Sequence, residues 1–387
     1  MKILFAEWES AGKNDLKEAF IAEGHELVCF PLGITAVQLF SEIENELLSA
    51  LHKEKPDIVF SVNYLSAVSD ICNKENIRYV SWTYDCPYRE AYSSTIMNPC
   101  NIIYLFDKTL YLEFHNAGIT TVHYMPMAAN VERLDSMVDN SKLPFFYDIS
   151  FVGSLYVEEG QDTYIDQVLP SLSAYTKGYL MGLMNSQLKI RGYDFIEELL
   201  SPVIDELWKI LPIQMQPDGM ETREYLYAQY VIGRRLTTLE RLDLLEAVAG
   251  RHLVDLFTWG KDFTMSYVCN HGSVDYYTEM PWVFKKSKIN LNISLWGIKS
   301  GIPLRAMDIM GCGGFLLSNF QRDFLDFFVP DEDFVFFENK EDLLRKIDYY
   351  LIHEDERKAI AKNGHDKVAA GHTYRHRVKE MLAPCEK

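Results

Sequence analysis

The sequence predicts an α/β protein made of two parallel-sheet domains. Short β-branched or aromatic runs alternate with amphipathic helical stretches from the start of the chain, and the same alternation resumes after a polar segment near the middle. The length of 387 residues suits two domains or slightly more. With 48% apolar and 24% charged residues, the composition is that of a globular protein with a large core.

The first domain is predicted over residues 1–140. Its apolar runs indicate strands at 2–7, 25–30, 57–63, 78–84, 102–106 and 121–126, and its helical periodicity indicates helices at 16–24, 35–55, 65–75 and 108–117. Gly24 is typical of a residue that ends a helix. Right-handed crossovers place the carboxyl ends of parallel strands at one edge, so we expect ligands to bind there.

The second domain is predicted over residues 146–370, after a polar linker at 131–148. A new series of strands opens at 148–154, and residues 156–250 read as a helical insertion after that first strand. The alternation then resumes, with strands at 252–260, 289–294, 314–319 and 333–339 and helices at 305–311, 340–355 and 356–382.

Charge and motif content exclude several classes of protein. The 56 acidic and 38 basic side chains give a net charge of −18, which argues against a protein that tracks nucleic-acid polymers. The sequence has no apolar run of about 18 residues, so no transmembrane helix is expected. Seven scattered cysteines without a CxxC pair predict neither a disulfide framework nor a metal site, and they suit a cytoplasmic protein. The motifs GxGxxG, GxxxxGK[ST], HExxH and GxSxG are absent.

The segment 271–319 carries the clearest functional signal. Arg305 stands near the start of a predicted helix, where backbone N–H groups and the helix dipole already favour an anion, and its guanidinium adds bidentate phosphate binding. Asp308 lies three residues later on the same face, where a carboxylate can accept hydrogen bonds from ribose hydroxyls. A surface ion pair between the two residues explains the pattern equally well.

The run RAMDIMGCGGFLLSN at 305–319 resembles the donor-binding helix of glycosyltransferases with the GT-B fold, and is most similar to the bacterial family related to the spore-maturation protein CgeB. The resemblance extends to FVGS at 151–154, TTLERLDLLEAV at 237–248 and VDYYTEMPWVFKKSKINLNIS at 274–294, and more loosely to SWTYDCPY at 81–88. It implies two Rossmann-like domains facing a cleft, with the acceptor on the first and the nucleotide sugar on the second. It also implies that the C-terminal segment 371–387 packs back on the first domain.

The resemblance assigns roles to several donor-side residues. Gly153 and Ser154 would face the donor diphosphate, Tyr276 and Tyr277 would lie near the base, and Asp308 would bind the ribose. His271, just before these tyrosines, is expected to contact phosphate, although an isolated histidine is more often structural. Ser300, followed by Gly301, stands where many retaining enzymes of this fold carry a glutamate eight residues before the ribose-binding acid. Arg305 is then the main countercharge for the leaving diphosphate.

These features predict a metal-independent glycosyltransferase without a cofactor, in which a UDP-sugar is the expected donor. An enzyme without a metal must stabilise the leaving diphosphate with cationic side chains and helix N-termini. The acceptor is expected to be a hydroxyl of a protein, peptide or surface glycan. Asp85, in a loop after the strand at 78–84, is our first candidate for the base, and Glu7 is the second. An Asx turn explains Asp85 as well. A non-catalytic nucleotide-sugar-binding protein and a sugar-nucleotide epimerase remain alternatives.

Overall fold

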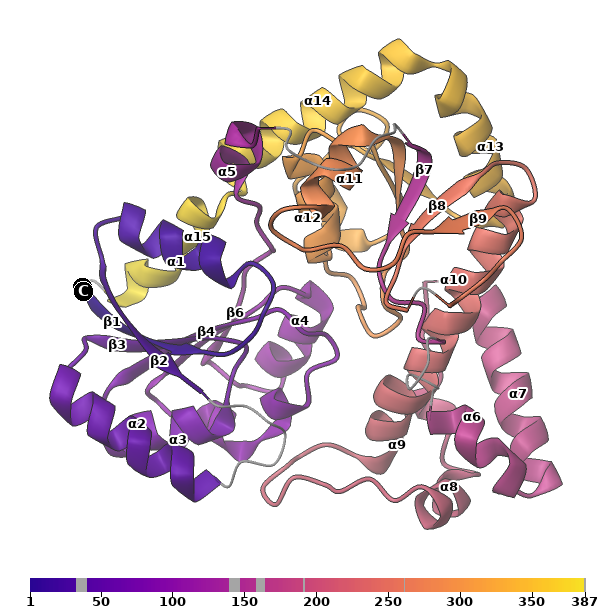
Figure 1. Cartoon of the computed structure of the whole chain (residues 1–387). Helices are drawn as coiled ribbons and strands as arrows, with labels where there is room; N and C mark the ends of the chain where they lie inside the picture. The colour runs from indigo at the N-terminus through magenta and orange to yellow at the C-terminus, as the bar shows by residue number, and fades with distance from the viewer. Residues whose placement is uncertain (33–39, 139–146, 158–163, 191, 261, 386–387) are drawn as a thin grey trace.

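The computed structural model describes residues 1–32, 40–138, 147–157, 164–190, 192–260 and 262–385, with the side chains of 40–42 excepted. In this part of the chain two six-stranded parallel sheets form the centres of two lobes (Figure 1). The strand orders are β2-β1-β3-β4-β5-β6 and β12-β11-β10-β7-β8-β9. Helices cover both faces of the sheets, as the alternating sequence pattern predicts.

The first lobe follows the predicted elements closely. Its strands are β1 (Lys2–Glu7), β2 (Glu26–Pro31), β3 (Ile58–Val62), β4 (Arg78–Thr83), β5 (Asn101–Leu105) and β6 (Val122–Tyr124). Its helices are α1 (Lys13–Ala22), α2 (Phe40–Glu54), α3 (Ser66–Lys74) and α4 (Lys108–Asn116), and a short α5 (Val131–Ser136) leads to the second lobe. Every residue of β3 is buried, because helices pack on both faces of a parallel sheet.

The second lobe contains β7 (Tyr147–Val152), β8 (Val254–Phe257), β9 (Val268–Asn270), β10 (Ser287–Asn292), β11 (Leu316–Asn319) and β12 (Val335–Phe337). Its sheet packs against α11 (Met280–Lys286), α12 (Leu304–Gly311) and α13 (Lys340–Ile352), and α14 (Glu354–Gly371) packs against α12 and α13. The prediction of one continuous helix at 356–382 is wrong, because the structure has two helices there. The helix breaks at His372 and Thr373, and the side chain of Thr373 caps a separate α15 (Tyr374–Leu382).

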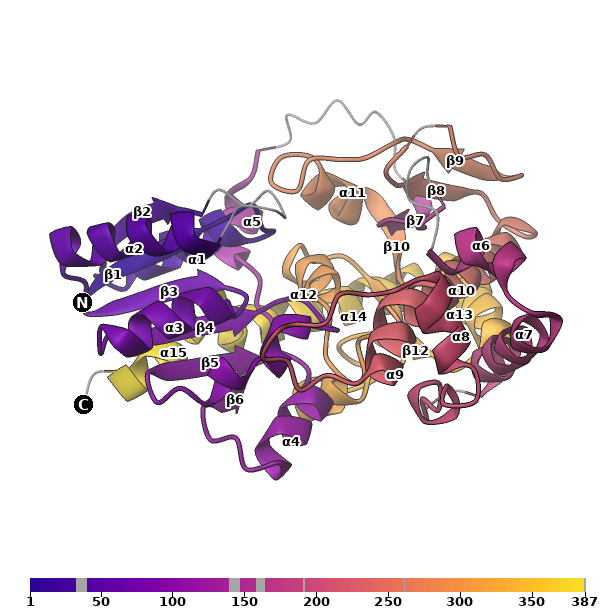
Figure 2. The same ribbon diagram turned by 90° about the horizontal axis from the view of Figure 1, so that it is seen from below.

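The predicted helical insertion lies between β7 and β8. It consists of α6 (Tyr164–Val168), α7 (Ala174–Lys189), α8 (Ile204–Ile210), α9 (Arg223–Leu226) and α10 (Gly233–Ala249), with a π-helical segment at Tyr227–Ile232 before α10. The prediction of nearly continuous helix missed an extended stretch at 211–222. Figures 1 and 2 show this stretch, between α8 and α9, reaching from the insertion toward the first lobe.

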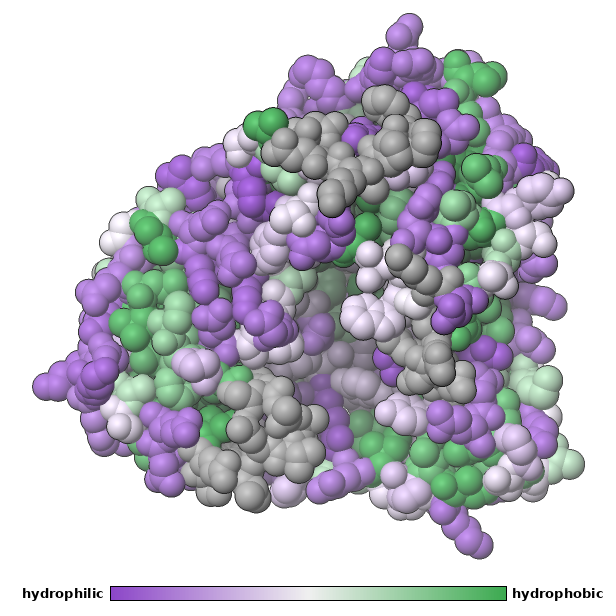
Figure 3. Space-filling model, viewed as in Figure 1, coloured by the Kyte–Doolittle hydropathy of each residue, from purple (hydrophilic) through white to green (hydrophobic). Residues whose placement is uncertain are grey.

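The two lobes contact each other, and the face of the molecule seen in Figure 3 is hollowed at its centre. The stretch at 211–222 meets the first lobe through a hydrogen bond of 2.8 Å from the N–H of Met220 to the carbonyl of Tyr92. The last helix, α15, packs against α1 of the first lobe. There Tyr374 is buried beside Trp82, with ring centroids 6.0 Å apart. The C-terminal helix therefore completes the first lobe.

Candidate functional site

Arg305 lies at the carboxyl edge of the second sheet. Pro303 caps α12 with extended backbone (ψ 150°), so Arg305 stands in the first turn of the helix. Its Nη1 donates to Oδ1 of Asn292 at the end of β10 (3.2 Å), and its guanidinium lies 5.4 Å from the ring centroid of Phe151 on β7. Among the residues that the structure describes, no carboxylate forms an ion pair with Arg305.

A second arginine makes this edge more positive. Arg241 on α10 is buried and donates to the carbonyl of Ile293 (2.7 Å) and to the carbonyl of Ser154 (2.5 Å). Burial, together with repulsion from Arg241, lowers the pKa of Arg305 to about 9. An anion bound between the two arginines would offset both the desolvation of Arg305 and its repulsion from Arg241, because it would neutralise their charge. The predicted residues Gly153, Ser154 and Arg305 are thus brought together.

Asp308 lies deeper, under Tyr276. Its Oδ1 accepts a hydrogen bond of 3.3 Å from the Tyr276 hydroxyl, whereas its buried Oδ2 has no hydrogen-bond partner in the described structure. Burial, followed by repulsion from Asp15, raises the pKa of Asp308 well above its ordinary value. A buried oxygen without a partner is unusual, since such groups normally find one. A hydroxyl-bearing ligand would supply the missing donor.

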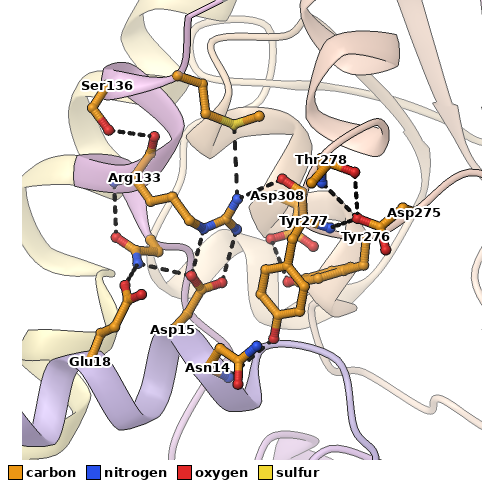
Figure 4. Close-up of polar contacts among 12 residues, drawn as sticks. Asn14, Asp15, Glu18, Arg133, Ser136, Asp275, Tyr276, Tyr277, Thr278 and Asp308 are labelled. Carbon is orange, nitrogen blue, oxygen red and sulfur yellow. Dashed lines mark hydrogen bonds and ion pairs between the residues drawn. The ribbon is translucent and has the colours of Figure 1, made fainter. Parts of the chain in front are cut away.

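Tyr277 joins the two lobes beside Asp308 (Figure 4). Arg133 of α5 holds Asp15 of α1 through two hydrogen bonds, of 2.6 and 2.9 Å, and its guanidinium lies 5.2 Å from the Tyr277 ring centroid. The Tyr277 hydroxyl accepts from the N–H of Asn14 (3.1 Å). A cavity of about 350 Å³ opens next to Asp15 and Arg133, between α1, α5 and α15. The paired tyrosines are thus held at the joint between the lobes.

Asp85 stands at the carboxyl end of β4 and is exposed to solvent. Asn63, in left-handed backbone (φ 60°), organises this loop. Its Oδ1 accepts from the N–H of Tyr84 (2.7 Å), and its Nδ2 donates to Oδ2 of Asp85 (2.7 Å). Although solvent reaches the carboxylate, the surrounding protein desolvates it and raises its pKa, and the hydrogen bond from Asn63 opposes this shift. The next residues approach the second lobe, because the Cys86 thiol donates to the carbonyl of Gly297 (3.2 Å).

Glu7 and His271 already have charged or polar partners. Glu7 forms ion pairs with Lys13 (3.2 Å) and Lys17 (3.1 Å). Partial burial would raise the pKa of Glu7, but the hydrogen bonds from the two lysines prevail and lower it. His271 places Nε2 2.7 Å from Oδ1 of Asp255 and stacks on Phe257. The roles predicted for Glu7 and His271 stay predictions.

Ser300 and Gly301 bind a carboxylate of the first lobe. Asp107 is buried at the start of α4, and its Oδ2 accepts from the backbone N–H groups of Lys299 (2.7 Å), Ser300 (2.8 Å) and Gly301 (3.0 Å). The Ser300 hydroxyl donates to Oδ1 (3.2 Å). Successive N–H groups of this kind form a nest for anions. Ser300, the position at which many retaining enzymes of this fold carry a glutamate, therefore contacts a carboxylate of the other lobe, that of Asp107.

Sequence reasoning assigned no role to Arg241, Asn292 and Asp107, and it did not select Asn63 as a site residue. Arg241 comes from the insertion and Asp107 from the other lobe, so no local spacing links them to the segment at 271–319. Asn63 was noted as the end of a strand and carries a usable signal, since asparagine tolerates left-handed backbone. Within the described ranges, no helix is long and apolar enough to span a bilayer.

Comparisons with known proteins agree with this architecture. Residues 234–383 match a family model described as glycosyl transferase-like. No curated protein matches the sequence. A glycosyltransferase from Rickettsia africae is 12% identical with a TM-score of 0.52, over 99% of this chain and 98% of that one. Sucrose-phosphate synthase from Thermosynechococcus elongatus is 9% identical with a TM-score of 0.55, and the match covers 99% of this chain and 98% of that one.

HepE from Anabaena, solved in complex with UDP and glucose, is 9% identical with a TM-score of 0.52, and the match covers 99% of both chains. At these identities the likeness concerns the fold. The two facing six-stranded parallel sheets are those of the GT-B fold, and the fold predicted from the sequence is confirmed.

Proposed function

We propose that the protein is a glycosyltransferase that moves a sugar from a nucleotide-sugar donor to an acceptor hydroxyl. One observation carries the proposal. Arg305 lies half-buried at the carboxyl edge of the second sheet with its pKa lowered to about 9 by desolvation, and no described carboxylate pairs with it. Ligands of open α/β sheets bind at this edge. A diphosphate would supply the charge that the site lacks.

The donor is proposed to be a UDP-sugar. The glycosyl transferase-like match covers α10, α11 and α12, which contain Arg241 and Arg305, and HepE was solved with UDP and with UDP-glucose. The ribose would lie over Asp308, whose Oδ2 has no hydrogen-bond partner among the described residues. Tyr276 can keep its hydrogen bond of 3.3 Å, because that bond goes to Oδ1 of Asp308. The likeness of residues 305–319 to the CgeB-related family stays a prediction.

Departure of the diphosphate is the step that the positive edge would assist. As the bond between sugar and phosphate breaks, negative charge develops on the diphosphate, and cations fixed in a desolvated site stabilise it without reorganising. Arg305 and the N–H groups of the first turn of α12 would act here, with Arg241 strengthening the potential. In this proposal no metal ion takes part in the transfer.

The base for the acceptor hydroxyl is proposed to be Asp85. Its carboxylate is exposed at the edge of the first sheet, beside the loop that meets Gly297 of the second lobe. Its raised pKa makes it a stronger base than an ordinary aspartate. Glu7 is the second candidate, although its ion pairs with Lys13 and Lys17 reduce its basicity. The acceptor would be a hydroxyl of a protein, peptide or glycan.

Binding of UDP, GDP and TDP, measured by calorimetry, tests the donor site. Wild type should bind UDP most tightly, and Arg305→Ala should weaken binding by about tenfold to a hundredfold, the cost of a charged hydrogen bond. Arg251→Ala is the matched control, because Arg251 forms an exposed pair with Asp348 after α10. No binding of any nucleotide, or equal binding by both variants, would refute the proposal.

Turnover separates an enzyme from a binding protein. With UDP-sugars and a panel of acceptor hydroxyls, Asp85→Asn should lower kcat by at least about a hundredfold and leave UDP binding unchanged. Glu7→Gln should retain activity. If Glu7→Gln loses turnover and Asp85→Asn keeps it, the base is Glu7. Binding of UDP without transfer to any acceptor or to water would favour the non-catalytic alternative.

A further inference from the structure

Three potential metal ligands meet on two neighbouring strands of the second sheet. Asp255 on β8 is the register partner of Cys269 on the parallel strand β9, and His271 follows two residues later on the same side of the chain. One ligand atom from each residue lies within 4.8 Å of the other two. The prediction from spacing found no metal motif, since the third ligand comes from the adjacent strand.

The local packing holds two of the ligands in place. The ring of His271 stacks on Phe257, with ring centroids 4.7 Å apart, and the backbone N–H of His271 donates to the carbonyl of Leu256 (2.8 Å). Nε2 then lies 2.7 Å from Oδ1 of Asp255, which is buried, whereas the Cys269 thiol is exposed. The histidine and the carboxylate are thus oriented before any metal binds, and the thiol lies beside them, open to solvent.

We propose that Asp255, Cys269 and His271 form a zinc site with a fourth position open to water. Imidazole nitrogen, thiolate sulfur and carboxylate oxygen are the donors that Zn²⁺ takes in proteins, at about 2.0–2.3 Å and in tetrahedral geometry. One thiolate and one carboxylate balance the charge of the ion. Binding needs side-chain movements within the present spacing, and it releases the thiol proton to solvent. None of the three ligands is among the partners of Arg305 described above.

Other histidine–carboxylate pairs in the protein lack this arrangement. His52 pairs with Glu75 at 2.8 Å, and His252 pairs with Asp348 at 2.6 Å. Neither pair belongs to a group of three ligands in the described part of the chain. Cys29, the other cysteine classed as exposed in the described structure, is in no such group either. These residues provide matched controls for each ligand type.

Zinc and cobalt titrations of the full-length protein test the proposal. Wild type should bind one equivalent of Zn²⁺, and its Co²⁺ form should show sulfur-to-cobalt charge-transfer absorption. Cys269→Ser should abolish that absorption, and His271→Ala should weaken zinc binding by more than about tenfold, the least that a lost outer-sphere partner costs. Cys29→Ser and His52→Ala should bind as wild type does.

Alkylation of wild-type protein gives a test that needs no variant. Zn²⁺ should slow the modification of Cys269 by iodoacetamide, read at the peptide level, and leave the modification of Cys29 unchanged. Absence of stoichiometric zinc binding, thiolate absorption that survives Cys269→Ser, or equal protection of both cysteines would overturn the proposal. If His271→Ala binds zinc as wild type does but loses UDP binding, His271 contacts phosphate and the zinc site is refuted.

Discussion

Arg305 lies directly against Gly153: a Cβ on residue 153 would be 2.6 Å from Nη2 of the arginine. Residue 153 also has φ of 150°, which side chains rarely adopt. The glycine therefore lets the end of β7 approach the guanidinium. Because the obstructed group is the end of a flexible side chain, an added methyl group would displace Arg305 and leave the fold in place.

Gly153→Ala is expected to damage ligand binding more than stability. The displaced guanidinium should weaken UDP binding by about tenfold or more. Gly118→Ala is the control, since Gly118 also has positive φ (88°) and an added Cβ there meets nothing within 4 Å. Both variants should lose about 1–3 kcal/mol of unfolding free energy through backbone strain. Calorimetry and urea titration measure the two effects, and unchanged UDP affinity in Gly153→Ala would contradict the assigned site.

Asn63→Ala should change the pH profile of transfer. Asp85 acts as a base only when ionised, so activity falls as the pH drops through its pKa, which desolvation by the surrounding protein raises. The hydrogen bond from Asn63 lowers that pKa, so its removal should move the acidic limb of the rate profile to higher pH. Asn76→Ala is the control, because Asn76 has the same left-handed backbone (φ 54°). A limb at the same pH in wild type and Asn63→Ala would exclude this positioning role.

Asp107→Ala should cost more stability than the loss of an ordinary helix cap. Asn339 caps α13 through the N–H of Asp342, and Asn339→Ala should cost about 1 kcal/mol. Asp107 caps α4 and also accepts three N–H groups from 299–301, so its loss leaves buried donors without partners and should cost about 3 kcal/mol. Denaturant unfolding compares the two. Equal losses would mean that the contact between the lobes contributes nothing to stability.

Asp308 should make folding less favourable as the pH rises. Its pKa in the folded protein lies well above 3.8, because it is buried with Asp15 nearby and Tyr276 as its one hydrogen-bond donor. The folded state therefore holds a proton that the unfolded state has lost, and unfolding free energy falls above about pH 4, by at most about 1.4 kcal/mol per pH unit. Asp308→Asn removes this dependence. Parallel pH dependences of unfolding in wild type and Asp308→Asn would disprove the shift.

Much of the fold could be predicted because its signals are local. Ile58–Val62 is a short apolar run between polar segments, and Gly24 ends the first helical pattern, so strand and helix were found with nearly correct bounds. The strand Val268–Asn270 was missed, since its three residues carry no alternation. Residues 211–222 were taken as helical, although they are held by contacts with the first lobe that no local pattern reveals.

The candidate site was predictable only where one segment carries it. Arg305 and Asp308 stood out because a helix start and a three-residue spacing can be read directly from the sequence. The environment of each could not be read in this way. Asp308 owes its raised pKa to burial and to Asp15, which is almost three hundred positions away, and Ser300 meets Asp107 across the joint between the lobes. Such contacts follow from the docking of the lobes.

The crossing of α15 has a consequence for the order in which the protein is made. The hydroxyl-bearing ring of Tyr374 fills the space beside Gly12 and Trp82, and the Tyr104 hydroxyl donates to the carbonyl of Met381 (3.2 Å). During translation these partners leave the ribosome after the whole second lobe. The first lobe, although synthesised first, can cover the apolar face that packs against α15 only after that helix has been synthesised.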